Sequence, residues 1–210
     1  MLLQASIEMF RREQSNALPL LLYFIDEEYS NTHPNFLSTI PCGQAAWMRA
    51  LRLAKQNGLL YLFTKRLLEE KVNFSESYLR DIIEKEQRTL IRFKKTLEFL
   101  LYLSRREEFD LLFVKLYRGL PYVPRDIDIL VKREAMARVL FALRKNSFIV
   151  NTFDNAEATA WKEGLVKIDL YQGFRYLSMQ FIHQDLLWES RRIVQVCDVP
   201  CAIPSRESDI

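Results

Sequence analysis

An apolar, β-branched run that carries two carboxylates stands at Arg125-Asp126-Ile127-Asp128-Ile129-Leu130-Val131. Such a run is typical of a buried strand. Successive strand side chains point to opposite faces, so Asp126 and Asp128 share one face and the aliphatic residues share the other. Aspartate is rarely buried unless it is paired or binds a metal. A divalent cation beside the two carboxylates is therefore expected, and Mg²⁺ suits hard oxygen ligands.

A second run, at residues 165–171, repeats this alternation. Lys167, Asp169 and Tyr171 take one of its faces, so a second strand offers a third carboxylate. Three aspartates on adjacent strands could bind two Mg²⁺ ions about 4 Å apart, which suits in-line displacement at phosphorus. One ion would lower the pKa of an attacking hydroxyl, and the other would bind a triphosphate and the leaving pyrophosphate. Asp169 is the candidate general base, or the ligand nearest the nucleophile.

Composition bounds the class of protein. The chain has 210 residues, 49% hydrophobic and 27% charged, which is ordinary for a globular protein of one large or two small domains. A net charge of +3 argues against bulk, charge-driven nucleic-acid binding but leaves local basic patches open. Three cysteines and two histidines argue against a zinc site and against a disulfide framework. With neither a signal peptide nor a bilayer-length apolar run, a cytoplasmic protein without a membrane partner is expected.

The pattern of apolar residues predicts an α+β protein with a boundary near residue 109. Residues 1–108 form the expected helical region, with helices at 2–14, 17–29, 43–56, 59–71 and, without Gly or Pro, 75–108. Gly58 is the expected left-handed residue after the third of these helices. Residues 109–210 form the expected small domain with a mixed sheet. Its predicted strands are 111–117, 126–131, 148–153, 159–163 and 165–171, its helices 132–145 and 180–189, and its hairpin 192–196 with 199–203.

This order of elements resembles the nucleotidyltransferase superfamily of the DNA polymerase β type. A closer resemblance is to an uncharacterised nucleotidyltransferase group in which a helical region precedes the D-x-D strand. The matching residues are 113–115, 125–131 and 167–170, with 47–68 similar to the helical region and 199–207 to a Pro-Ser-x-Glu segment. The resemblance implies transfer of a nucleoside monophosphate from an NTP, with ATP the expected one, to an acceptor hydroxyl. Asp126, Asp128 and Asp169 would be the catalytic and metal-binding residues.

The phosphate side of the site departs from this pattern. The superfamily places Gly-Ser or Gly-Gly just after the first strand, whereas here Lys115 is followed by Leu116 and Tyr117, and Gly119 comes late. Backbone N–H groups near Gly119 could still approach phosphate. Lys115, Arg118 and Arg125 would then add positive charge, so these four residues are the expected nucleotide-binding residues.

Other interpretations remain open. Lys115 and Lys167 could simply pair with the aspartates. The protein could be a catalytically silent, nucleotidyltransferase-like binding or regulatory module, or an antitoxin-type protein that nucleotidylates a partner. The acceptor could be a protein, RNA or a small molecule. The chain ends at Ile210, where the resembling group continues into helices, so it could be a minimal or a truncated form.

Overall fold

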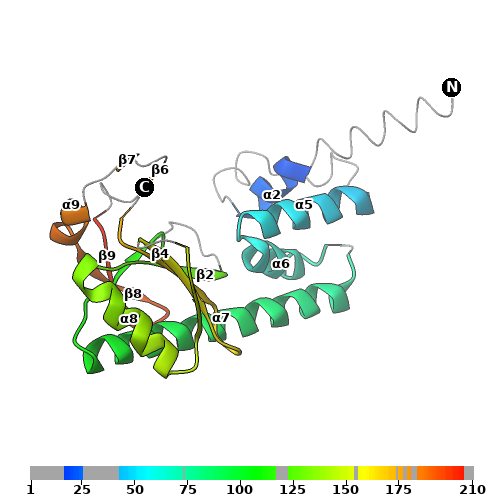
Figure 1. Ribbon diagram of the computed structural model, residues 1–210. Coiled ribbons are helices and arrows are strands. Elements are labelled where there is room, and N and C mark those ends of the chain that lie inside the picture. Colours follow the sequence, from blue (N-terminus) through cyan, green and yellow to red (C-terminus); the bar gives the residue numbers. More distant parts are fainter. Residues whose placement is uncertain are drawn as a thin grey trace. The chain divides into compact units, whose positions relative to one another are not determined.

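The structure is a computed structural model that describes residues 17–25, 43–72, 74–116, 123–153, 156–173, 175–176, 179–180 and 184–205, with the backbone alone described at 175–176 and 179–180. The described helices are α2 (Ala17–Ile25), α5 (Gln44–Gln56), α6 (Leu60–Glu69), α7 (Glu76–Arg106), α8 (Arg133–Lys145) and α9 (Gln184–Glu189). The described strands are β1 (Leu112–Val114), β2 (Asp126–Leu130), β3 (Ile149–Thr152), β4 (Glu157–Trp161), β5 (Lys167–Tyr171), β6 (Arg175–Tyr176), β7 (Met179–Gln180), β8 (Arg192–Val196) and β9 (Val199–Ile203) (Figure 1).

Contacts divide the chain into two compact units, and one division in the sequence falls between Arg88 and Thr89 of α7. The first unit takes its described part from residues up to 88 and from Val123, and it is helical. Its core comes from α2, α5, α6 and the start of α7, and includes the fully buried Leu20, Phe63 and Leu67. Gly58 follows α5 at φ 71°, so the expected left-handed residue at this helix end is confirmed.

The second unit holds the rest of the described chain, around a five-stranded sheet of order β1-β2-β5-β4-β3. The central pair, β2 with β5, is parallel, and the other pairs are antiparallel, so the sheet is mixed. The hairpin β8–β9 turns at Cys197 and Asp198, which confirms the predicted hairpin. Both turn residues have positive φ.

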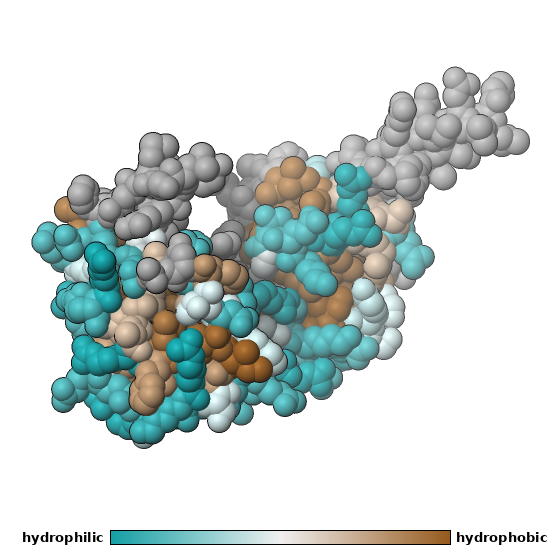
Figure 2. All heavy atoms as spheres, viewed as in Figure 1, coloured by the Kyte–Doolittle hydropathy of each residue, from teal (hydrophilic) through white to brown (hydrophobic). Residues whose placement is uncertain are grey.

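One face of this sheet is covered by helices. The C-terminal half of α7 supplies Phe93, Leu97, Leu100 and Leu103 to the core, and α8 supplies an apolar stripe around Val139. Both pack on the aliphatic residues of β2 and β5 (Figure 1). The alternation of these strands therefore sends the charged side chains to the other face. On both units, brown apolar residues lie among mostly teal polar ones on the visible surface (Figure 2).

Thr96 of α7 fixes the start of β5. This threonine is fully buried, and its Oγ1 accepts a hydrogen bond of 3.1 Å from the backbone N–H of Val166. The same hydroxyl donates to the carbonyl of Arg92 at 2.7 Å. A long helix on the covered face thus holds the residue that precedes Lys167 and Asp169.

The α+β class is confirmed, with helices followed by a mixed sheet. The strand expected at 111–117 is described only as Leu112–Val114, because Lys115 at φ 60° ends it. The strand expected at 159–163 lies two residues earlier, at Glu157–Trp161, and β6 and β7 were not anticipated. The helix expected at 2–14 lies outside the described residues. The division into 1–108 and 109–210 stays a prediction. Within the described ranges, no helix has both the length and the apolar character that a bilayer crossing requires.

Candidate functional site

The parallel pairing of β2 with β5 brings the predicted carboxylates together. Asp128 lies opposite Asp169 in the register, and Asp126 lies opposite Lys167. Neighbouring strands are about 4.8 Å apart and directly paired residues share a face, so the three carboxylates lie on one face of the sheet. The sequence alternation predicted this shared face, whereas the pairing of Asp128 with Asp169 needed the register.

Asp169 is the most enclosed of the three. The residue is 7% exposed, and Oδ1 is buried with no hydrogen-bond partner among the described residues. Thr159 of β4 is its other neighbour across the sheet. A buried carboxylate oxygen without a partner is unfavourable, since the oxygen has lost its water and gained nothing in return. The position therefore suits a cation.

Two lysines already pair with the three carboxylates. Lys167 Nζ lies 2.7 Å from Asp169 Oδ2 and 3.9 Å from Asp126 Oδ2. Lys115 Nζ lies 3.1 Å from Asp128 Oδ1. The hydrogen bond to Asp169 raises the pKa of Lys167, so its side chain is an ammonium ion at neutral pH. The sequence left open whether these lysines pair with the aspartates, and in the structure they do.

Tyr171 joins this group from the end of β5. Burial raises the pKa of the Tyr171 hydroxyl, and the charge of Asp128 and a hydrogen bond to it act in the same direction. The hydroxyl thus stays protonated at neutral pH. Lys115 Nζ also lies 5.7 Å from the centroid of the tyrosine ring. The sequence alternation placed Tyr171 on this face but gave no reason to assign it a partner.

Lys115 has a backbone conformation that glycine adopts more easily. It follows β1 with φ 60°, in the left-handed region that is uncommon for a residue with a Cβ. This is where the resembling superfamily places glycine after its first strand. The chain here makes the turn with lysine and directs the ammonium group to Asp128.

The other expected nucleotide-binding residues are placed differently. Arg125 donates a hydrogen bond of 3.3 Å from Nη1 to Thr89 Oγ1 on α7. Arg118 and Gly119 lie outside the described residues. Their roles, and that of Lys115 at phosphate, stay predictions.

The donor set fits a hard divalent cation in its chemistry. Three carboxylates share a face, and one of their oxygens is buried without a partner. The oxygens do not converge in the arrangement that the structure has: in the described part of the chain, no three His, Cys, Asp or Glu side chains group closely enough to hold a metal ion. The lysine contacts account for this, because each carboxylate is turned towards an ammonium group.

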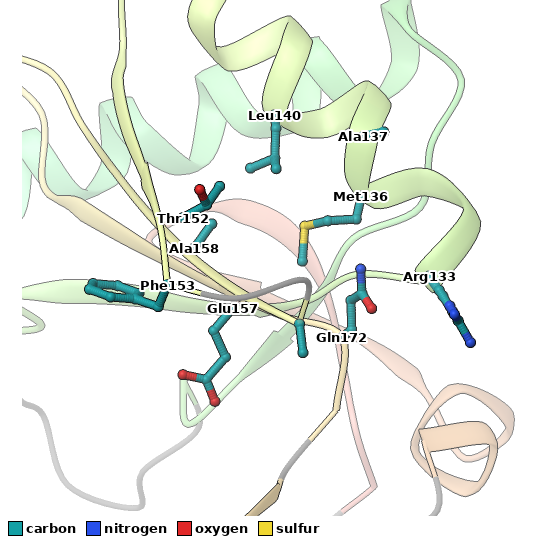
Figure 3. A pocket seen from close by; sticks show the side chains of 10 residues that line it. Arg133, Met136, Ala137, Leu140, Thr152, Phe153, Glu157, Ala158 and Gln172 are labelled. Carbon is teal, nitrogen blue, oxygen red and sulfur yellow. The ribbon is translucent and has the colours of Figure 1, made fainter.

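A cavity of about 750 Å³ lies elsewhere in the second unit, between α8 and the strands β3 and β4. Figure 3 shows Met136 and Leu140 reaching into it from α8, towards Ala158 on the sheet. Arg133 and Gln172 lie at one end of it (Figure 3). None of the five predicted site residues that the structure describes lines this cavity, so it is not the carboxylate site.

The likeness of this chain to known proteins is slight. The sequence matches no protein-family model and no curated protein. Among solved structures, the chain is similar to a lincosamide antibiotic adenylyltransferase, LnuA, in a crystal structure with lincomycin bound. The two are 15% identical with a TM-score of 0.42, and the similarity covers 54% of this chain and 81% of that one. A similarity of this degree is no guide to the reaction or the substrate.

Proposed function

We propose that the protein is a nucleotidyltransferase that uses Mg²⁺ to move a nucleoside monophosphate from an NTP to an acceptor hydroxyl. The observation that carries the proposal is the register of β2 and β5, which sets Asp126, Asp128 and Asp169 on one sheet face with a buried, unpartnered oxygen on Asp169. The D-x-D strand and the third aspartate resemble the polymerase β type superfamily in the same residues. ATP is the expected nucleotide.

The proposed reaction is an in-line displacement at the α-phosphorus. The acceptor oxygen forms a bond to that phosphorus, the bond from phosphorus to the bridging oxygen breaks, and pyrophosphate leaves with the electron pair. Asp169, the most buried of the three carboxylates, accepts the hydroxyl proton. Asp126 and Asp128, with Asp169 completing the site, would hold Mg²⁺, and the ion would supply charge stabilisation at the phosphates. Lys115, Arg118, Gly119 and Arg125 bind the phosphates.

A second candidate, a catalytically silent binding or regulatory module, has one observation in its favour. Lys115 and Lys167 give each of the three aspartates an ammonium neighbour, so no carboxylate faces the sheet without a cation even when no metal ion is bound. A silent module would bind a nucleotide or a partner without transferring the nucleoside monophosphate.

Two labels on the same nucleotide separate these candidates. The protein is incubated with Mg²⁺, a cell extract as the source of acceptors, and ATP labelled at either the α- or the γ-phosphate. A transferase passes the α-label to an acceptor and releases the γ-label as pyrophosphate. The same experiment with the other NTPs covers a different nucleotide preference, and Asp128→Asn is the inactive control. Absence of α-label transfer from every NTP, with Mg²⁺-dependent binding retained, would favour the silent module.

A further inference from the structure

One ammonium group lies between two of the proposed metal ligands. Lys167 Nζ is within 4 Å of a carboxylate oxygen on each of two strands, 2.7 Å from Asp169 and 3.9 Å from Asp126. Lys167 and Asp169 are two residues apart on β5 and share a face, and Asp126 pairs with Lys167 across the sheet. The contact therefore follows directly from the strand register.

This nitrogen lies beside carboxylate oxygens that a bridging ion would have to approach. A divalent cation that bridged Asp126 and Asp169 on the side where Lys167 lies would approach Oδ2 of both residues, the oxygens nearest the ammonium group. An ammonium group and a divalent cation also repel each other at such short range. The Lys167 ammonium group and a divalent cation therefore cannot occupy this position at the same time.

We infer that Lys167 is the resident counter-cation of the carboxylate site and that a divalent metal ion binds only by displacing it. The inference rests on the proposed function. The freed ammonium group then needs a new anionic partner, and the phosphates of an NTP supply one. Metal and nucleotide thus bind as a pair, and the metal alone binds weakly.

The test is binding of Mn²⁺ without nucleotide, measured by electron paramagnetic resonance on the full chain. Lys167→Met removes the competing charge and keeps the length of the side chain, so we expect it to bind Mn²⁺ at least about tenfold more tightly than the unsubstituted protein. Lys167→Arg keeps the charge, and Lys145→Met removes a lysine that pairs with none of the three aspartates. Both should stay within about threefold of the unsubstituted protein. Equal affinity for Lys167→Met and the unsubstituted protein, or an equal gain for Lys167→Arg, would overturn the inference.

Thermal unfolding gives a second readout. Lys167→Met leaves Asp169 buried without its ammonium partner, so its melting temperature should fall in a chelator and rise on addition of Mn²⁺ by more than that of the unsubstituted protein. If the variant does not fold even with Mn²⁺, the same Mn²⁺ binding and melting measurements are made on Lys115→Met. Lys115 Nζ contacts Asp128, another of the proposed metal ligands, at 3.1 Å. A variant in which Mn²⁺ restores no stability and binds no more tightly contradicts displacement.

The outcome is separable from that of the proposed function. Tighter Mn²⁺ binding by Lys167→Met supports displacement even if no nucleotide is transferred by the unsubstituted protein. Transfer by the unsubstituted protein, together with unchanged Mn²⁺ affinity in Lys167→Met, would leave the function standing and remove the role of the lysine.

Discussion

Asp169 and Asp128 are both far less exposed to water than Asp126. The side chains of Asp169 and Asp128 are 10% and 13% exposed, whereas that of Asp126 is 47% exposed. A carboxylate in such a position costs free energy unless something positive faces it. That requirement connects the lysine contacts of the structure with the metal ion of the proposal, since either can meet it.

At this scale, Asp169→Asn is the most informative substitution. The amide keeps the size of the side chain but cannot accept the hydroxyl proton, so transfer should fall roughly 10²–10⁴-fold if Asp169 is the general base. The measurement is the rate of α-label transfer, and circular dichroism checks that the variant folds. Asp198→Asn is a matched control at a 93% exposed side chain on the β8–β9 turn, and it should keep the full rate.

The two described cysteines provide a test of burial that is independent of function. Cys201 is fully buried, and burial raises the pKa of its thiol to about 12. Burial also raises the pKa of the thiol of Cys197, which is partly buried. In a Cys42→Ser background, we expect neither thiol to be ionised at pH 8, and Cys201 to resist Ellman's reagent until the protein unfolds. Rapid reaction of Cys201 in the native protein would contradict its position in the core.

The same thiol has a consequence for stability against pH. The folded-state pKa of Cys201 lies above the ordinary value, so the folded protein holds this proton more tightly than the unfolded chain does. Its contribution is complete below the unfolded pKa of about 8.5 and is lost as the pH rises from there towards 12. Cys201→Ala should therefore show a smaller loss of stability between pH 8 and pH 10 than the unsubstituted protein in denaturant titrations.

At the scale of the elements, α7 controls where β5 begins. Thr96→Val removes the acceptor for the Val166 N–H and leaves that group buried without a partner, which should cost about 1–3 kcal/mol in the free energy of unfolding. Thr64→Val is the control, because Thr64 is equally buried but its hydroxyl bonds only to carbonyls of its own helix. Denaturant titration of both variants measures the difference, and equal losses would contradict a special role for Thr96.

The elements also show what sequence could and could not predict. Apolar periodicity predicted α5, α6, α7 and α8 and the central strands to within a few residues, since each has one buried face. Alternation along β2 and β5 predicted that Asp126 and Asp128 share one face of β2 and that Asp169 lies on the face of β5 opposite its aliphatic residues. The register between the strands and the position of Lys167 between two carboxylates depend on tertiary pairing, which no local pattern encodes. The left-handed turn at Lys115 was also missed, because lysine carries no signal for positive φ.

At the scale of the whole molecule, two cores share one long helix. Phe63 belongs to the core of the first unit and Phe93 to that of the second, and both are fully buried. We predict that the two units unfold with a degree of independence. Phe63→Ala, at a cost of about 3–5 kcal/mol, should speed amide exchange in α5 and α6 and leave that of β2 and β5 nearly unchanged. Phe93→Ala should do the reverse, and uniform acceleration in both variants would indicate one cooperative unit.

The most direct test of the central claim is nucleotide binding by titration calorimetry. Each of the four NTPs is titrated into the full chain with Mg²⁺ and again with a chelator, and the series is repeated for Asp128→Asn and for the control Asp198→Asn. We predict saturable binding of at least one NTP that requires Mg²⁺, that is lost in Asp128→Asn and that persists in Asp198→Asn. Binding that is indifferent to Mg²⁺ and to Asp128, or no binding of any NTP, would contradict a metal and nucleotide site on this face of the sheet.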